Sequence, residues 1–301
     1  MYEAHFGLRV KPFELVPNPD FLYLSSTHKR ALMYINYALM ERVGFVLLTG
    51  EVGSGKTTLI RNFIKRHDET VTLAKVFNTR VNTEQLLSLI NEDFGLDSRD
   101  KGKVQLLKDL NTFLIKEYEQ GRHALLVIDE AQNLTPDLLE EVRMLSNLET
   151  DSSKLLQIVL VGQPELRGTL VRADMLQLRQ RISIMCHLTR LNRPEVEEYI
   201  RHRLEVAGNR DALQFTSDAL DRIYNSSGGI PRLVNIICNF LMVTAFAEKA
   251  NEVNVAMVDD TVEGTGLASL GPGNDDPVLR KRALLRALGV PAGTQVQGAE
   301  E

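Results

Sequence analysis

The chain has 301 residues, 44% of them hydrophobic and 25% charged, a balance typical of a folded globular protein and unlike that of a disordered or fibrous one. Its 35 lysines and arginines are outnumbered by 40 acidic residues, and the net charge of −5 argues against a surface built for indiscriminate DNA binding. The two cysteines, Cys186 and Cys238, are too few for a disulfide framework and lack metal-ligand spacing, so we expect a reducing, cytoplasmic location.

The most apolar stretch, residues 233–247, is shorter than a membrane span and is interrupted by Asn235, Asn239 and Thr244. It predicts a buried helix. The N-terminus has no apolar core of signal-peptide type. We therefore expect no transmembrane segment.

The first two thirds of the chain predict alternating strands and helices. An irregular segment rich in Pro, Phe and Asn precedes a helix that begins near Ser26. Strands are expected at 45–49, 71–77, 124–128, 155–161 and 182–188. Helices are expected at 57–66, 82–94, 104–120 and 136–148. The alternation predicts an α/β fold in which helices cover both faces of a parallel sheet.

Beyond about Leu191 we expect no further strands, and helices are predicted at 194–204, after Thr216, and from Pro231 to about Ala250. The predicted domains are an α/β domain with its N-terminal segment (1–190), a small all-helical domain (191–267), and a linker with a short basic helix and tail (268–301). Two interpretations of that basic helix remain open: it is a solvated terminal helix, or it docks to a partner or an anionic membrane.

A glycine-rich segment between the first strand and the following helix fits the pattern GxxxxGK[ST] of phosphate-binding loops. The glycines allow backbone N–H groups to face phosphate oxygens, and the helix N-terminus favours an anion. Lys56 would reach the terminal phosphates, and the Thr57 hydroxyl would hold Mg²⁺. The alternative is a tight turn without a ligand. The candidate binding residues are Gly50, Glu51, Val52, Gly53, Ser54, Gly55, Lys56, Thr57 and Thr58.

Two carboxylates, Asp129 and Glu130, follow the apolar strand 124–128. Alternation along a strand would point them in different directions. We expect Asp129 to organise Mg²⁺ and Glu130 to act as general base in hydrolysis. By itself the pattern also fits a strand entering solvent.

Polar residues at two further strand ends are candidates for the same site. Gln163 follows a buried strand and could sense the γ-phosphate or orient water; Asn78 could orient Glu130. Each also fits an ordinary cap or turn residue. Arg179 and Arg181 precede the last strand, and Arg232 begins a later helix; such arginines can stabilise charge in phosphoryl transfer.

Taken together, six segments resemble the AAA+ ATPases of the general secretion pathway protein A family and their relatives from exopolysaccharide and exosortase gene clusters. They cover about residues 1–267 and read MYEAHFGLRVKPFELVPNPDFLYLS, GEVGSGKTTL, VIDEAQNL, VLVGQPELR, LRQRI and SGGIPRLVN. More distantly, the chain is similar to AAA+ transposition proteins.

The resemblance implies a P-loop NTPase of AAA+ type, with ATP and Mg²⁺ bound between the sheet domain, a helical lid and a neighbouring subunit of a homo-oligomer. By position, Lys56 and Thr57 correspond to Walker A, Asp129 and Glu130 to Walker B, and Gln163 to sensor 1. Arg181 corresponds to the arginine finger, with Arg179 as its rival, and Arg232 to sensor 2. The segment from Leu24 to His28 would lie near adenine.

Secretion-type members are expected to continue into a transmembrane helix and a periplasmic peptidoglycan-binding domain. This chain ends shortly after its basic segment, so we expect a stand-alone protein or a fragment. The leading hypothesis is an ATPase that drives or switches an assembly in secretion or polysaccharide export.

The competing hypothesis is an ATP-dependent DNA-binding regulator of transposition, favoured by eight arginines against five acidic residues at 171–210. A third, nucleotide binding without turnover, conflicts with the complete pair of carboxylates.

Overall fold

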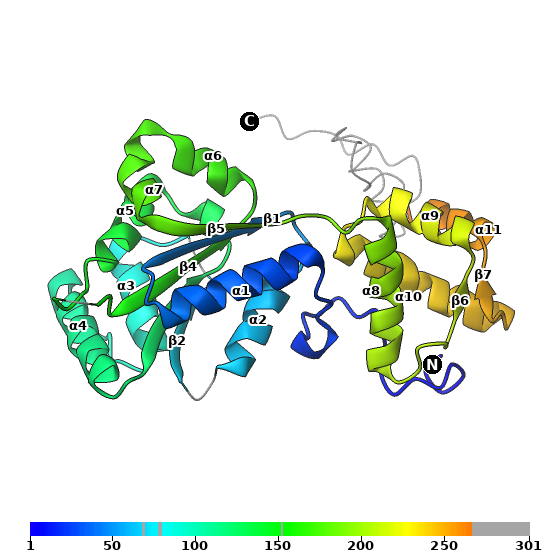
Figure 1. The fold of residues 1–301 in the computed structure, drawn as a ribbon, viewed down its shortest axis with the longest axis horizontal. Helices are drawn as coiled ribbons and strands as arrows, with labels where there is room; N and C mark the ends of the chain where they lie inside the picture. Colours follow the sequence, from blue (N-terminus) through cyan, green and yellow to red (C-terminus); the bar gives the residue numbers. More distant parts are fainter. Residues whose placement is uncertain (68–69, 78–79, 152, 267–301) are drawn as a thin grey trace. The chain divides into compact units, whose positions relative to one another are not determined.

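The computed structural model describes residues 1–67, 70–77, 80–151 and 153–266, which group into two compact units (Figure 1). One unit is Pro17–Thr189, and the other combines Met1–Val16 with the chain from Arg190 onward. The sequence-based division kept residues 1–16 with the α/β domain, so the two divisions differ for this segment. The predicted linker and tail at 268–301 lie outside the described residues.

The larger unit is built on a five-stranded sheet in which every neighbouring pair is parallel and the strand order is β2-β3-β4-β1-β5. The predicted α/β fold is therefore confirmed. The strands are β1 (Phe45–Gly50), β2 (Val71–Val76), β3 (His123–Ile128), β4 (Leu156–Gly162) and β5 (Ile182–Leu188).

Helices connect these strands, and most of them lie where the sequence predicts. The two short helices α6 and α7 and three single 3₁₀ turns were not predicted, because segments of three to seven residues are too short to show a helical period. The α-helices are α1 (Ser26–Met40), α2 (Lys56–Arg66), α3 (Thr83–Asp93), α4 (Lys103–Glu119), α5 (Pro136–Leu145), α6 (Glu165–Val171) and α7 (Leu176–Arg181). The 3₁₀ turns are η1 (Pro19–Phe21), η2 (Ala131–Asn133) and η3 (Ala173–Met175).

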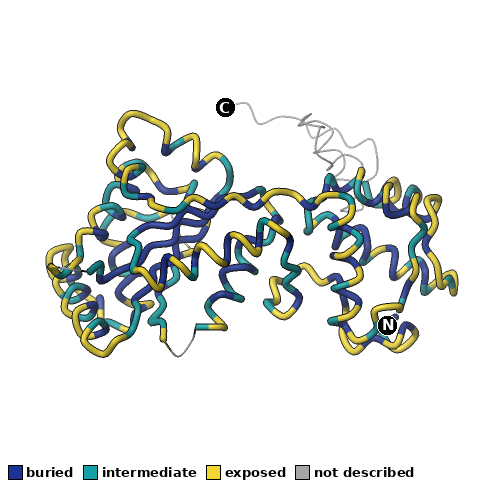
Figure 2. Tube along the Cα trace, viewed as in Figure 1, coloured by how far each residue is buried: buried dark blue, intermediate teal, exposed yellow. Residues whose placement is uncertain are grey.

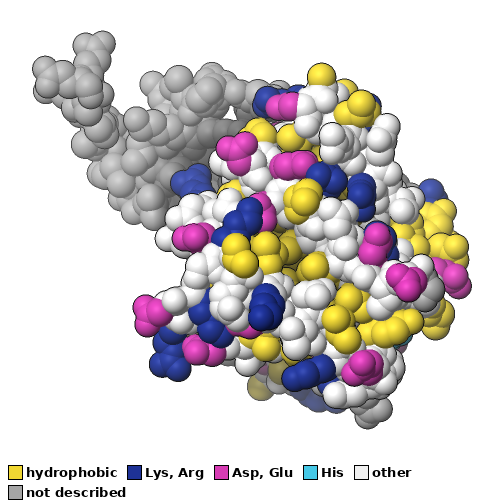
Figure 3. Space-filling model, turned by 90° about the vertical axis from the view of Figure 1, so that its left-hand side faces the viewer, with side chains coloured by type: hydrophobic (Ala, Val, Ile, Leu, Met, Phe, Trp, Pro, Cys, Tyr) yellow, Lys and Arg dark blue, Asp and Glu magenta, His cyan; other side chains and the backbone are white. Residues whose placement is uncertain are grey.

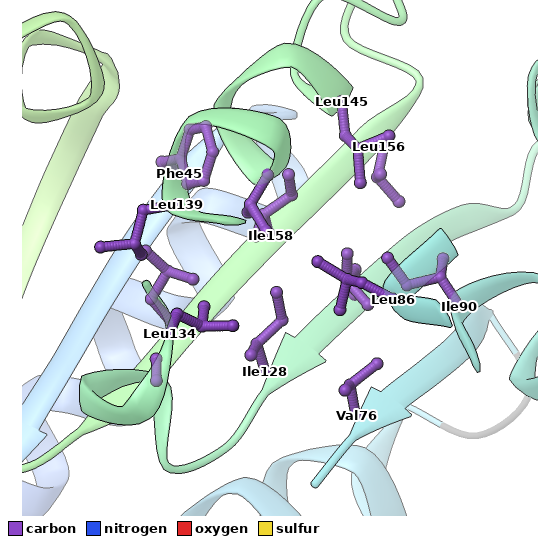
Figure 4. Close-up of a cluster of buried hydrophobic side chains, with 14 of the residues drawn as sticks. Phe45, Val76, Leu86, Ile90, Ile128, Leu134, Leu139, Leu145, Leu156 and Ile158 are labelled. Atoms are coloured by element: carbon purple, nitrogen blue, oxygen red, sulfur yellow. The ribbon is translucent and has the colours of Figure 1, made fainter. Parts of the chain in front are cut away.

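The sheet is buried on both faces, which is why its central strands read as continuous apolar runs. Along β3, Leu126 and Ile128 pack into one core with α3, α4 and α5, whereas Leu125 and Val127 pack into another with α1 and α2. Figure 4 shows part of the first core, and Figure 2 shows the strands as buried segments between more exposed helices. The result is three layers, with the strand ends free to present polar residues.

The smaller unit contains the helices α8 (Arg193–Ala207), α9 (Ser217–Ser227), α10 (Pro231–Glu248) and α11 (Val255–Gly264). Thr216 caps α9 through its side chain, as predicted, and Pro231 is the first residue of α10. The expectation that strands stop after Leu191 is wrong in one detail, because β6 (Gln214–Phe215) and β7 (Glu252–Val253) form a two-residue parallel pair. A two-residue strand carries no detectable alternation.

The N-terminal segment packs against this helical unit through hydrogen bonds and buried aromatic rings. The buried guanidinium of Arg203 donates to the backbone carbonyls of Pro12 and Glu14, and the Arg9 N–H donates to the Ala207 carbonyl at 2.7 Å. Apolar side chains of the segment, including Phe13 at 1% exposure, lie in the core. The sequence shows the apolar residues but not the partner that buries them.

Among the described residues, none of the helices combines the length and apolarity needed to cross a bilayer. The most apolar stretch lies in α10, as predicted. Its Asn235 is buried and accepts a hydrogen bond of 2.8 Å from the Tyr199 hydroxyl, so the polar interruption of this stretch is satisfied inside the unit.

A substitution in β3, an interior strand of the sheet, tests the importance of the core. Leu126→Ala should lower the free energy of unfolding by about 2–5 kcal/mol, because Leu126 is fully buried and its removal leaves a cavity. Val104→Ala is the matched control, since Val104 is 82% exposed and should change stability by less than about 0.5 kcal/mol. Urea titration followed by circular dichroism measures both; equal stabilities would contradict this description of the core.

Candidate functional site

The glycine-rich loop joins β1 to α2, and its glycines are required by local geometry. A Cβ on Gly50 would lie 2.7 Å from Ser54 Oγ and 3.0 Å from the Leu188 carbonyl oxygen. Gly53 and Gly55 have φ of +80° and +97°, in the region that favours glycine. The loop therefore follows a tight path that side chains would block.

Lys56 extends into this loop and is 6% exposed. Its Nζ donates to the carbonyl oxygens of Gly50 at 2.8 Å and Glu51 at 2.9 Å. Burial lowers the pKa of the Lys56 ammonium, while the nearby carboxylates of Glu130 and Asp129 act in the opposite direction. The loop thus holds a buried cation against two backbone carbonyls, and this positive charge favours the binding of an anion.

The Thr57 hydroxyl, in the first turn of α2, contacts the Asp129 carboxylate, which directly follows β3. Thr57 Oγ1 donates to Asp129 Oδ2 at 3.0 Å, and Asp129 is 5% exposed. A hydroxyl and one carboxylate are oxygen donors of the kind that Mg²⁺ uses when phosphates and water complete its coordination. The donor set fits the predicted ion.

Asp129 is buried and Glu130 is exposed, and a turn separates them rather than the predicted alternation along a strand. β3 ends at Ile128, and Glu130 has a left-handed φ of +52°. Its backbone N–H donates to Asp129 Oδ1 at 3.0 Å. Asp129 therefore stays buried beside Thr57 while Glu130 is exposed.

The Glu130 carboxylate lies beside two glutamine amides. Its Oε2 accepts from Gln132 Nε2 at 2.5 Å and is 3.3 Å from Gln163 Nε2. Gln132 Oε1 in turn accepts from the Gln163 backbone N–H at 3.0 Å. Sequence reasoning identified Glu130 and Gln163 but missed Gln132, whose only signal is a polar residue two positions after the carboxylates. The other residue predicted to orient Glu130, Asn78, lies outside the described residues.

His28 brings the first turn of α1 against the phosphate-loop segment. It is 3% exposed, its Nδ1 lies 2.6 Å from Ser25 Oγ, and its Nε2 lies 3.1 Å from the Ser54 carbonyl oxygen. A Cβ on Gly55 would approach Nε2 to 3.0 Å. The predicted adenine-side segment therefore contacts the loop itself.

The hydrogen bonds of Arg179 and Arg181 lie elsewhere in the larger unit. In α7, Arg181 Nη1 donates to Ser146 Oγ at 3.3 Å, and Arg179 Nη1 donates to the Val171 carbonyl at 3.3 Å. Both side chains are partly buried. Arg232 is the second residue of α10 in the helical unit and is exposed.

Comparison with known proteins agrees with this fold. Residues 40–170 match the family model described as an AAA domain. The fold is similar to the ORC2 protein of Aeropyrum pernix in its ADPNP–ADP complexes, with a TM-score of 0.63, 20% identity and coverage of 89% of this chain and 83% of that one. It is also similar to the RuvB Holliday junction branch migration motor of Thermotoga maritima, with a TM-score of 0.56, 20% identity and coverage of 93% and 87%.

A P-loop between β1 and α2, followed by Asp129 and Glu130 after β3, defines the class: the fold is that of the AAA+ P-loop NTPases, and residues 40–170 form an AAA domain. Within that class it is similar to general secretion pathway protein A of Aeromonas hydrophila, with 42% identity over 254 residues. The aligned region is 84% of this chain and 46% of the relative, so the chain spans about half the length of that protein. The predicted family resemblance is confirmed.

The crowding around Gly50 can be tested by stability alone. Gly50→Ala should lower the free energy of unfolding by about 1–3 kcal/mol, because the added Cβ would press on the Leu188 backbone. Gly168→Ala in α6 is the control: no atom lies within 4 Å of its Cβ position, and alanine should leave stability unchanged or raise it by about 0.5–1 kcal/mol. Chemical denaturation gives both values. A Gly50 variant as stable as the Gly168 variant would show that the loop can relax.

Proposed function

We propose that this protein hydrolyses ATP with Mg²⁺ as cofactor. The observation that carries the proposal is the convergence of three strand ends. The P-loop after β1, Asp129 and Glu130 after β3, and Gln163 after β4 lie on neighbouring parallel strands and are joined by hydrogen bonds. Ligands of open α/β sheets bind at this edge.

Each group has a distinct role in the proposed reaction. The segment Gly50–Thr58 surrounds the phosphates with backbone N–H groups, and Lys56 pairs with the terminal phosphates. Thr57 and Asp129 hold Mg²⁺, which would neutralise charge on the phosphates when bound. Glu130 accepts a proton from the attacking water, and Gln163 lies beside it to orient that water or to contact the γ-phosphate.

The arginines extend the proposal to an oligomer. Arg181 donates to Ser146 at the end of α5. It precedes Ile182, which pairs with Phe45 at the start of β1, whereas the P-loop follows the other end of β1. We propose that Arg181 acts on the nucleotide of a neighbouring subunit. Arg232, by resemblance, is proposed to contact the γ-phosphate from the helical unit.

The cellular role follows from the relative rather than from the site. Similarity to general secretion pathway protein A covers most of this chain, and on that basis we propose that the ATPase drives or switches an assembly in secretion or exopolysaccharide export. The absence of a disulfide framework in the sequence supports action on the cytoplasmic side of that assembly.

Contacts of the arginine-rich stretch at 171–210 weigh against the DNA-binding alternative. Three of its arginines form ion pairs with carboxylates of their own unit: Arg172, Arg193 and Arg201. Arg203 is buried against backbone carbonyls. On the face shown in Figure 3, basic and acidic side chains are interspersed rather than gathered by sign. These four of the eight arginines are therefore engaged by carboxylates or backbone carbonyls of the chain itself, which favours the ATPase proposal without DNA as partner.

Two substitutions separate binding from turnover. Lys56→Ala should weaken ATP binding by roughly 10- to 100-fold, because a charge-assisted hydrogen bond is lost. Glu130→Gln should bind ATP normally but lower kcat by about 10²–10⁴-fold, because the base is removed. Fluorescent-nucleotide titration and phosphate release measure the two effects. Lys65→Ala, in the same helix and 61% exposed, is the control for Lys56. Wild-type turnover by Glu130→Gln would refute the assignment of the base.

A mixing experiment tests completion of the site between subunits. Arg181→Ala should bind ATP but turn over about 10³-fold more slowly, the lower end of the effect of an arginine finger. Adding Lys56→Ala protein should restore part of the activity, because mixed interfaces pair an intact Arg181 with an intact P-loop. Wild-type specific activity should also rise with protein concentration.

Arg172→Ala, which removes an exposed arginine paired with Asp174, is the control for Arg181 and should retain wild-type turnover. Activity that is independent of concentration, together with no recovery on mixing, would exclude action in trans.

A further inference from the structure

Gln132 links the two polar strand ends of the site through both ends of its amide. It lies in η2, directly after Glu130 and Ala131. Its Nε2 donates to Glu130 Oε2 at 2.5 Å, and its Oε1 accepts from the Gln163 backbone N–H at 3.0 Å. One side chain thus connects the carboxylate that follows β3 to the backbone that follows β4.

These two partners determine the orientation of the amide. A backbone N–H can only donate, so the oxygen of Gln132 faces Gln163. An ionised carboxylate can only accept, so the NH₂ group faces Glu130. Only a side chain that carries an acceptor and a donor on the same planar group satisfies both partners at this length.

The backbone makes room for this amide at Gly162, the last residue of β4. A Cβ on Gly162 would lie 3.0 Å from Gln132 Oε1, 3.4 Å from the Gln132 backbone nitrogen and 2.8 Å from Leu166 Cδ2. A larger residue would therefore push the amide away from Gln163. Gly162, the glycine of the sequence GQPEL, therefore leaves the space that the Gln132 amide occupies.

We propose that Gln132 is a positioning residue for the general base and ties it to Gln163; this inference rests on the proposed ATPase function. Gln163 offers Glu130 a second, longer contact of 3.3 Å through its side chain. When that side chain turns to the nucleotide, Gln132 remains as an amide donor that holds the carboxylate. Its own anchor is the Gln163 backbone, which does not depend on the side chain's position.

The inference predicts a loss confined to turnover. Gln132→Ala should lower kcat by about 10- to 100-fold, the order expected when a reacting group is misplaced by about 1 Å. KM and the affinity for ATP should stay within about twofold of wild type, since Gln132 contacts neither Lys56 nor Thr57 through the hydrogen bonds described. Gln105→Ala is the control: it also removes an exposed glutamine–carboxylate hydrogen bond, to Asp109 within α4, and should leave kcat unchanged.

Gln132→Glu tests whether the NH₂ donor of Gln132 is needed, because glutamate keeps the length of the side chain but lacks that donor. Glutamate keeps an oxygen for the Gln163 N–H but turns a second carboxylate toward Glu130, so it should not rescue kcat. In a Glu130→Gln background, Gln132→Ala should cause less than about a twofold further loss, because the residue acts through Glu130. Thermal unfolding of every variant shows whether the site remains folded.

The outcomes distinguish this inference from the function on which it rests. Wild-type kcat in Gln132→Glu, a rise in KM equal to the fall in kcat/KM, or an undiminished loss in the Glu130→Gln background would each overturn the role of Gln132. The proposed ATPase function would then survive if Glu130→Gln alone still lowered kcat by about 10²–10⁴-fold. A folded wild-type protein that binds ATP but releases no phosphate at any concentration would overturn both.

Discussion

The parallel pairing of β1 with β4, and of β4 with β3, is the constraint on which the site depends. Parallel strands end at the same edge of a sheet, so residues that are far apart in the chain become neighbours there. Thr57 and Asp129 illustrate the result, since a hydrogen bond of 3.0 Å joins them across 72 positions of the chain. Both faces of the sheet are buried, and this burial holds the strand ends in place.

Charge balance at this edge couples stability to the proposed chemistry. Lys56 is buried, and the cost of burying its ammonium is offset by two backbone carbonyls and by the carboxylates after β3. A phosphate would offer the same ammonium a stronger partner, because it carries a full negative charge. The Lys56 ammonium, whose charge is balanced by these groups, thus lies where an anion is expected to bind.

The surroundings of Glu130 differ from those of its neighbour Asp129. Asp129 is buried and tied to Thr57, whereas the left-handed turn at Glu130 carries its carboxylate out to the two glutamine amides. Adjacent carboxylates with different surroundings can serve different roles, one as a metal ligand and the other as a base. Gln132 contacts the Glu130 carboxylate, and Gly162, which has no side chain, leaves room for Gln132 there.

Much of this protein was predictable from local pattern. Apolar runs of five to seven residues predicted the five strands, Thr216 and Pro231 marked helix starts, and the segment Gly50–Thr57 identified the P-loop, because each signal lies within one turn or strand. Only the tertiary structure decided which distant groups meet. The packing of residues 1–16 on Arg203, the His28 contact with the loop, and the role available to Gln132 depend on contacts across 26 to 191 positions. A hydrogen bond between distant residues leaves no period in a single sequence, and an amide shows its partners only after the strands have paired.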